Sequence, residues 1–270
     1  MTLQSLFASL APSIVRITTK SGATGTGFMI GAYLVTNNHN LKAARHNASI
    51  MHRLETYDAQ NQSLQQWSCS GQELLDQFEV GSPENDHDYA VIKLERTPFT
   101  PGPLPLASVD VRVGDDVFFP GFHFEHPRLV LHTGHISSIY PSGVATVLQL
   151  DASVNHGVSG APLVHLASGS IVGIVSRKGT GLTEKIEELQ KFIDFNIRSF
   201  PGILETRTQN HMQGMPQHDP HNEPSNFTLM ELAGLYTKMS DLLQELRRSA
   251  NVGIGYALCI KALKDEPLWD

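Results

Sequence analysis

GTGFMIGAYLVTNN (residues 25–38) is the stretch that first indicates how this chain folds. Its two β-branched and aromatic runs are broken at Gly31-Ala32, which is typical of a β-hairpin. Similar short runs, bounded by Gly, Pro or Asn, recur before and after it. They are SIVRITT (13–19), DYAVIKL (88–94), DVFFPGF (116–122), RLVLHTGHISSIY (128–140), ATVLQLD (145–151) and SIVGIVS (170–176). Many short strands without intervening helices indicate an all-β sandwich or barrel.

The pattern changes after Lys178, where apolar residues recur at helical spacing. We expect one helix over 183–200 and a second over 228–249, joined by an exposed polar loop at 205–226. The apolar stripe of the second helix consists of Leu232, Leu235, Met239, Leu242 and Leu246. Strand character returns in NVGIGYALCI (251–260). Residues 179–250 are therefore predicted to be a helical insertion within a β domain.

Composition excludes several classes of protein. The chain has 270 residues, 40% of them hydrophobic, which is too many for a disordered chain. It lacks a run of 18 apolar residues, so no transmembrane helix is expected. A net charge of −7 argues against binding to nucleic acid or to an acidic membrane surface. The two cysteines, Cys69 and Cys259, fit a reducing compartment, and the N-terminus does not resemble a signal peptide, so a cytoplasmic location is expected.

The chemistry is concentrated in DASVNHGVSGAPLV (151–164). Ser159 has glycine two residues before it and one residue after it, which suggests a tight turn. Such a turn can direct the N–H groups of Gly157 and Ser159 at one point, as an oxyanion requires. A serine hydroxyl needs a base and a group that orients the base. His39 and Asp88, each beside a predicted strand, are the candidates for these two roles.

These segments together resemble the trypsin/chymotrypsin-like serine peptidases, and most of all their bacterial HtrA-type branch. GTGFMIGAYLVTNNHN resembles the segment that carries the catalytic histidine, HDYAVIKLE the strand that carries the aspartate, and LDASVNHGVSGAPLV the segment that carries the nucleophile. SIVGIVS and NVGIGYALCI resemble two later strands of the same family. The matches cover roughly residues 13–178 and 251–265. No PDZ domain is expected after them.

The resemblance implies two antiparallel six-stranded β-barrels within a single peptidase domain spanning 1–270. The N-terminal barrel would cover about 10–105, and the C-terminal barrel about 106–178 together with 251–265. The helical insertion 179–250 would lie at one lip of the specificity pocket. It is expected either to pack its apolar stripes internally or to bind a regulatory partner or a second copy of the chain.

The resemblance also implies a role for each site residue. His39 would be the general base, Asp88 would orient it, and Ser159 would attack the peptide carbonyl, with the N–H groups of Gly157 and Ser159 as the oxyanion hole. The substrate, a protein or peptide, would be held by Ser153, His156, Ser176, Arg177, Lys178 and Ile254. Neither a metal nor an organic cofactor is expected.

The specificity pocket departs from that of trypsin-like relatives that cleave after basic residues. Ser153 at its base supplies no carboxylate, and Ile254 would narrow it, so cleavage after small or medium aliphatic residues is predicted. The alternative is that Arg177 or Lys178 selects an acidic residue. Val158 stands where zymogen-type relatives have an aspartate that pairs with a new N-terminus, so activation by N-terminal trimming is not expected.

Two alternative interpretations remain. The fold could carry an inactive module that binds peptides without cleaving them. Four histidines could suggest zinc, but His132 and His135 should point to opposite faces of one strand, which disfavours a shared site with His123 and His126.

Overall fold

The computed structural model describes residues 2–20, 22–94, 99, 106, 109–123, 127–178, 184–212, 225–249 and 253–269. The chain divides into two compact units. The first combines Met1–Gly179 with Asn251–Asp270, and the second is Thr180–Ala250. No described helix is long and apolar enough to cross a membrane.

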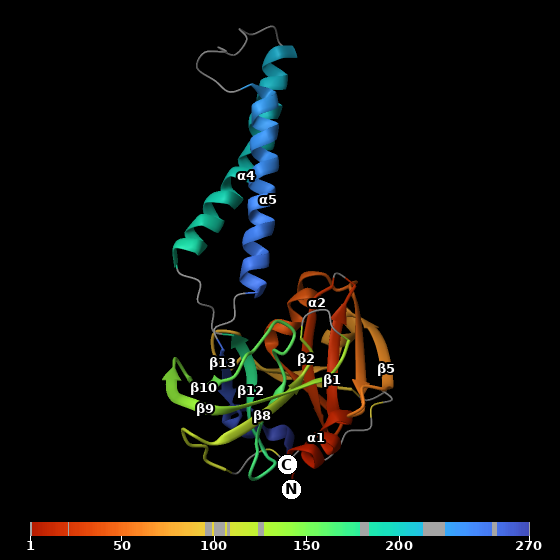
Figure 1. Cartoon of the computed structure of the whole chain (residues 1–270). Helices are drawn as coiled ribbons and strands as arrows, with labels where there is room; N and C mark the ends of the chain where they lie inside the picture. The colour runs from red at the N-terminus through yellow and green to blue at the C-terminus, as the bar shows by residue number, and fades with distance from the viewer. Residues whose placement is uncertain are drawn as a thin grey trace. The chain divides into compact units, whose positions relative to one another are not determined.

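The N-terminal half of the first unit is an antiparallel sheet of seven strands in the order β5-β4-β1-β2-β3-β7-β6 (Figure 1). In chain order these are β1 (Ile14–Thr19), β2 (Thr24–Ile30), β3 (Tyr33–Thr36), β4 (Met51–Tyr57), β5 (Ser63–Ser70), β6 (Phe78–Gly81) and β7 (Ala90–Lys93). The resemblance implied six strands here. The structure has seven, and the short helix α3 (Gly71–Asp76), which begins with a capping box on Ser70 and Glu73, separates β5 from β6.

The C-terminal half is a closed barrel of six antiparallel strands in the order β10-β13-β12-β11-β8-β9. They are β8 (Asp116–Gly121), β9 (Val130–Ser142), β10 (Ala145–Asp151), β11 (Pro162–His165), β12 (Ile171–Lys178) and β13 (Ile254–Cys259). Strand β13 pairs with both β10 and β12, so the chain returns to the barrel after the second unit. The predicted mainly β fold class is confirmed.

Short helices complete the first unit. They are α1 (Leu3–Leu10), η1 (Ala11–Ser13), η2 (Asn38–Leu41), α2 (Lys42–His46), α6 (Lys261–Lys264) and η3 (Pro267–Trp269). Helix α1 buries Leu6 and Leu10 in the main core, and the ring of Trp269 packs edge-on against Tyr33 of β3, with 5.5 Å between centroids. Both ends of the chain therefore pack on the β structure.

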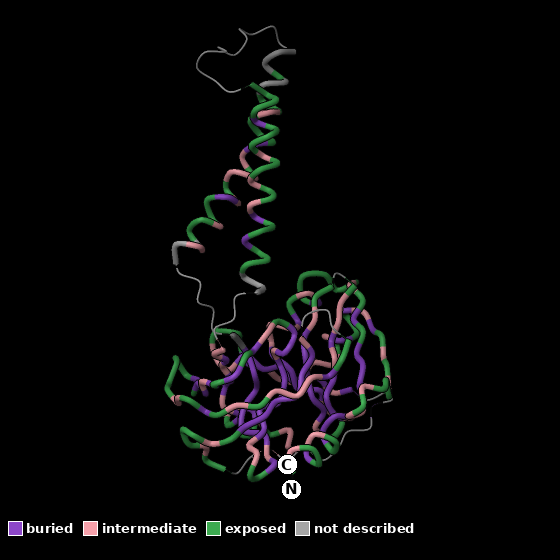
Figure 2. The backbone as a smooth tube through the Cα atoms, in the orientation of Figure 1, coloured by how far each residue is buried: buried purple, intermediate pink, exposed green. Residues whose placement is uncertain are grey.

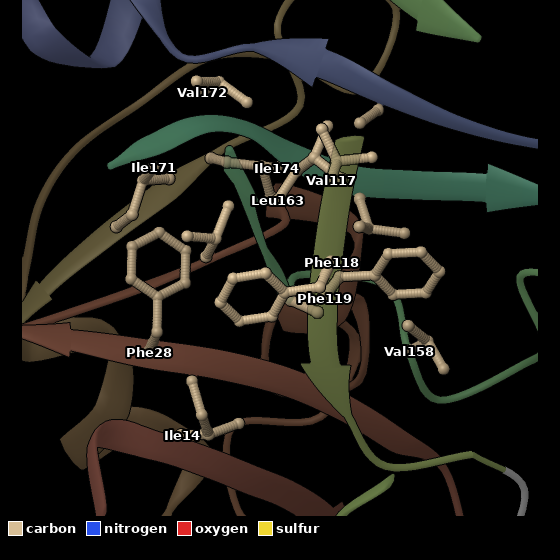
Figure 3. Close-up of a cluster of buried hydrophobic side chains, with 14 of the residues drawn as sticks. Ile14, Phe28, Val117, Phe118, Phe119, Val158, Leu163, Ile171, Val172 and Ile174 are labelled. Atoms are coloured by element: carbon tan, nitrogen blue, oxygen red, sulfur yellow. The ribbon is translucent and has the colours of Figure 1, made fainter. Parts of the chain in front are cut away.

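One hydrophobic cluster joins the two β halves. It contains Phe28 from β2, Phe118 and Phe119 from β8, and Ile174 from β12, all almost completely buried (Figure 3). Val158, one residue before the predicted nucleophile, is also in this cluster and is fully buried. Burial of apolar side chains from both halves stabilises their mutual position, and it anchors the loop that carries Ser159.

The second unit consists of two helices packed side by side, α4 (Glu184–Met212) and α5 (Asn226–Ser249) (Figure 1). The predicted loop at 205–226 is wrong for 205–212, which continue α4, and for residue 226, where α5 begins, while 213–224 lie outside the described residues. Helix α4 passes through Pro201, which has no backbone N–H to donate. Packing against α5 supports α4 across this interruption.

The face that α5 buries differs from the predicted stripe. Leu229 and Leu243 are buried, and Tyr236 lies against Phe200 of α4 with ring centroids 5.7 Å apart. On α4 the buried residues include Ile193 and Phe200. The predicted residues Leu232, Leu235, Leu242 and Leu246 are instead exposed, and Met239 is half-buried. Exposed positions predominate along α5, with buried ones at intervals between them (Figure 2). Helix α5 therefore has two apolar faces, of which α4 covers one.

Candidate active site

His39 is positioned by the short helix η2, which follows β3 directly. Its backbone N–H donates to Asp88 Oδ1 at 3.1 Å, and its Nδ1 lies 2.8 Å from Asp88 Oδ2. Asn38, the residue before it, donates from its side chain to the carbonyl of Ser82 at 2.8 Å. Because a carboxylate only accepts hydrogen bonds, Nδ1 must carry the proton and Nε2 is left as the acceptor. About a quarter of the His39 side chain is exposed.

Asp88 is held in an unusual backbone conformation just before β7. Its φ of 45° is rare for a residue other than glycine. Its carbonyl accepts hydrogen bonds from the side chain of Asn37 at 2.7 Å and from the backbone N–H of Asn38 at 3.3 Å. The side chain is buried. Backbone strain of this kind is found where the surrounding structure over-determines a functional geometry.

Ser176 lies at a β-bulge, because the register between β12 and β13 shifts between Val175 and Arg177. Its hydroxyl donates to Asp88 Oδ2 at 2.9 Å, and its backbone carbonyl accepts the hydroxyl of Ser159 at 2.8 Å. Bulges commonly redirect a side chain next to an active site. The sequence analysis assigned Ser176 to substrate binding alone, and its link to both Asp88 and Ser159 becomes visible only in the structure.

Ser159 lies in the loop between β10 and β11, flanked by two glycines with φ of 93°, Gly157 and Gly160. The N–H of Gly160 donates to the carbonyl of Val175 at 2.8 Å, which ties this loop to β12. In the part of the chain that the structure describes, the Ser159 hydroxyl donates to Ser176.

His39 and Ser159 line the same groove, which has a volume of about 340 Å³. Gly157 and His156 line it from the nucleophile loop. The remaining lining residues come from the N-terminal half: Ile17, Thr19, Ala23, Thr24, Gly25, Asn40, Lys42 and Ala43. The structure therefore brings the predicted base, the nucleophile and the oxyanion-hole glycine to one opening between the two β halves.

The predicted specificity residues are only partly described. Ser153 and His156 are exposed, and Ile254 is half-buried and pairs with Asp151. Val154, which the sequence analysis did not single out, is buried, and its side chain occupies the space beside Gly255: a Cβ placed on Gly255 would lie 2.3 Å from Val154 Cγ2. The side chains of Arg177 and Lys178 lie outside the described residues.

Two further residues, Thr26 on β2 and Asn40 on η2, were not predicted as site residues. Their side chains donate to the carbonyls of Gly157 and Ser159 respectively. The sequence signal for them was slight: Thr26 is a polar residue within the GTGF segment, and Asn40 is a polar residue that directly follows His39.

Of the histidines considered for zinc, His123 lies beside His132, with 5.9 Å between ring centroids, but His135 does not join them. His132 is stacked on Phe119, with 4.9 Å between centroids, while His135 is exposed and pairs with Asp116 at 3.0 Å. His126 lies outside the described residues. Burial, together with the neighbouring His123, lowers the pKa of His132 to about 4. Within the described ranges, no group of three or more His, Cys, Asp or Glu side chains is arranged to hold a metal ion.

Comparison with known proteins identifies the family. A model of the trypsin-like peptidase domain matches residues 25–174, more than half of the chain. The chain belongs to the trypsin-like peptidases. The predicted resemblance to this family, and to its HtrA-type members, is confirmed by relatives named as serine proteases.

Serine protease HTRA1 from Xenopus tropicalis is 31% identical over 190 residues, which cover 63% of this chain and 35% of that protein. Protease Do-like 5, a chloroplastic protein of Arabidopsis thaliana, is 26% identical over 233 residues, covering 74% of this chain and 68% of the relative. The crystal structure of Deg5 matches with a TM-score of 0.50 and 26% identity, over 64% of this chain and 83% of that one. The chain spans about a third of the length of the HTRA1 relatives that it matches.

Proposed function

We propose that this trypsin-like peptidase is a serine endopeptidase that hydrolyses peptide bonds in proteins through Ser159, His39 and Asp88. The observation that carries the proposal is the 2.8 Å contact between His39 Nδ1 and Asp88 Oδ2, together with the opening of His39 and Ser159 into one groove. Asp88 fixes the tautomer and the orientation of the ring, so that Nε2 faces the groove as a base.

The reaction would begin when the Ser159 hydroxyl rotates away from the Ser176 carbonyl toward Nε2. As Oγ forms a bond to the substrate carbonyl carbon, its proton passes to Nε2, and the carbonyl oxygen gains the negative charge. The N–H groups of Gly157 and Ser159 would stabilise this oxyanion. The protonated imidazole then gives its proton to the departing amine, which leaves an acyl-enzyme. Water, deprotonated by His39, releases the acid product and restores Ser159.

The proposed preference is for a small or medium aliphatic residue before the cleaved bond. The buried Val154 beside Gly255 and the half-buried Ile254 support it, because branched apolar side chains reduce the space available to a substrate residue. Selection of an acidic residue by Arg177 or Lys178 is the competing possibility. A positional-scanning peptide library distinguishes them, and dominant cleavage after Lys or Arg contradicts both.

The rival function is a peptide-binding module without catalysis. A fluorophosphonate probe labels only an activated serine, so the expected result is labelling of the wild-type protein and none of Ser159→Ala. The matched control is Ser137→Ala on β9, where an exposed hydroxyl bonds to the Gln149 carbonyl, and it should label normally. A wild-type protein that binds peptides but neither labels nor cleaves them would support the rival function.

We also propose that the second unit self-associates through α5. Leu232, Leu235, Met239, Leu242 and Leu246 follow one another at intervals of three and four residues, and four of the five are exposed. Alternating intervals of three and four are the pattern by which helices pack in coiled coils, and a second copy of α5 carries the same pattern. Replacing Leu235, Met239 and Leu242 together with Ser should reduce the mass measured by light scattering. The control is the exposed polar pair Lys238→Ser and Asp241→Ser, and a wild-type monomer would contradict the proposal.

A cytoplasmic location is proposed, and the state of the two cysteines supports it. Cys69 is buried and Cys259 half-buried, both as free thiols, and burial raises the pKa of Cys69 to about 12. A buried thiol with a raised pKa is poorly reactive, which suits a structural residue. Cell fractionation tests the location.

A further inference from the structure

Three hydrogen bonds connect the N-terminal half to the nucleophile loop, and two more hold the side chains that form them. Thr26 lies at their centre and is fully buried. Its hydroxyl donates to the carbonyl of Gly157 at 2.6 Å and accepts from the backbone N–H of Phe122 at 3.1 Å, and its own backbone N–H donates to the carbonyl of Ser159 at 2.9 Å. The side chain of Asn40 donates to the same Ser159 carbonyl at 2.9 Å, and also to the hydroxyl of Thr36 at 2.9 Å.

The backbone in this region is packed so closely that only small residues fit. A Cβ on Gly25 would lie 2.6 Å from Asn40 Cγ, so the amide of Asn40 occupies the space that a side chain at residue 25 would fill. A Cβ on Gly160 would lie 2.0 Å from the carbonyl oxygen of Thr26. The Thr36 hydroxyl donates to that same oxygen at 2.6 Å. We refer to Thr26, Thr36 and Asn40, with the carbonyls they hold, as the seam.

We propose that Thr26 and Asn40 are positioning residues that hold the oxyanion hole in its working geometry. This inference rests on the proposed function. Two of the carbonyls held in the seam belong to Gly157 and Ser159, the residues whose N–H groups would face the developing oxyanion. Because peptide units are planar, fixing the Gly157 carbonyl also orients the whole unit 157–158, which lies between the two units that carry the N–H groups of Gly157 and Ser159.

Val158 restricts the backbone torsions that remain free in this loop. Its side chain is buried in the core between the two held residues, and its N–H donates to the Asn155 carbonyl at 3.3 Å. Loss of the Thr26 hydroxyl would leave the Gly157 carbonyl buried without this donor, which favours rotation of that peptide. Rotation of that unit changes ψ of Gly157 and φ of Val158, which would turn the flanking N–H groups of Gly157 and Ser159 away from the oxyanion while the groove that binds the peptide stays in place.

The test compares Thr26→Val, which keeps the shape but removes the hydroxyl, with Thr26→Ser, which keeps the hydroxyl. We expect Thr26→Val to lower kcat on the order of tenfold to a hundredfold with KM changed less than about threefold, since displacement of a catalytic group by about 1 Å has effects of this size. Affinity for a peptide boronic acid, which mimics the oxyanion, should fall by a similar factor. Thr26→Ser should restore both, and Asn40→Ala should resemble Thr26→Val.

The matched control is Thr18→Val on β1, where the hydroxyl bonds to the Arg53 carbonyl outside the seam, and it should leave kcat unchanged. Wild-type kcat in Thr26→Val, or equal losses in the Val and Ser variants, overturns the proposal. If Thr26→Val does not fold, Asn40→Ala carries the same measurements, and unfolding of both would make the seam a folding element and reject the positioning role. Wild-type turnover and Ser159→Ala are measured alongside, because an inactive wild type refutes the proposed peptidase function itself.

Discussion

Gly160→Ala is the substitution that most directly tests the packing beneath the nucleophile. Two effects oppose the new methyl group. The backbone at residue 160 has φ of 93°, which strains any residue with a Cβ by about 1–2 kcal/mol. The Cβ would also lie 2.0 Å from the Thr26 carbonyl oxygen, 1.0 Å closer than the 3.0 Å limit for real contacts. Overpacking of this kind costs about 1–3 kcal/mol more.

The strain and the steric overlap can be separated with a second glycine. Gly114 has nearly the same φ, 96°, but a Cβ there would have no neighbour within 4 Å. Gly114→Ala should therefore lower the free energy of unfolding by about 1–2 kcal/mol and leave peptide turnover unchanged. Gly160→Ala should lower it by about 2–5 kcal/mol, the sum of both effects.

The overlap should also affect activity. Either the Thr26 strand or the Ser159 loop must move by about 1 Å to relieve the contact, and a displacement of that size lowers the rate about a hundredfold. Urea unfolding measures the stability of both variants, and fluorophosphonate labelling measures the reactivity of Ser159 in the folded protein. Equal stability losses in the two variants, with normal labelling of Gly160→Ala, would refute the steric argument.

Three further predictions concern other parts of the first unit. Burial and the neighbouring His123 lower the pKa of His132, so the unfolded chain binds a proton more readily and the free energy of unfolding falls as pH falls from about 6.5 toward 4. Between pH 7.5 and 5, urea unfolding of His132→Gln should show about 1–2 kcal/mol less loss of stability than the wild type, and equal losses in the two proteins would contradict this. Val158→Ala removes two buried methyl groups and should lower the free energy of unfolding by about 2 kcal/mol, whereas Val158→Asp should prevent stable folding, as thermal unfolding would reveal. Asp88→Asn should reduce peptide turnover about ten-thousandfold with KM little changed, because the imidazole then adopts the wrong tautomer; a loss below about tenfold would argue against the assigned role.

The sequence alone determined the mainly β class and the identity of the candidate triad. Alternating apolar residues and turn signals are local properties, so β2, β3 and β8 were predicted within one or two residues. Strands β4 and β5 were not predicted, because β4 buries the polar side chains of His52, Glu55 and Thr56. In addition, Met51 on β4 and Leu64 on β5 are exposed, so neither strand shows the expected alternation. The residues His39, Asp88 and Ser159 followed from short segments whose resemblance to the family is independent of the rest of the chain.

Only the tertiary structure decided how these residues are supported. The Thr26 hydroxyl and the Gly157 carbonyl are 131 residues apart, and the Ser176 hydroxyl and Asp88 are 88 apart. The role of Val158 as a buried anchor likewise depends on aromatic side chains from β8. In the second unit, the buried face of α5 was decided by contact with α4, since both faces of α5 carry apolar residues at helical spacing. Contacts of this kind exist only once distant segments pack together, so no local pattern in the sequence encodes them.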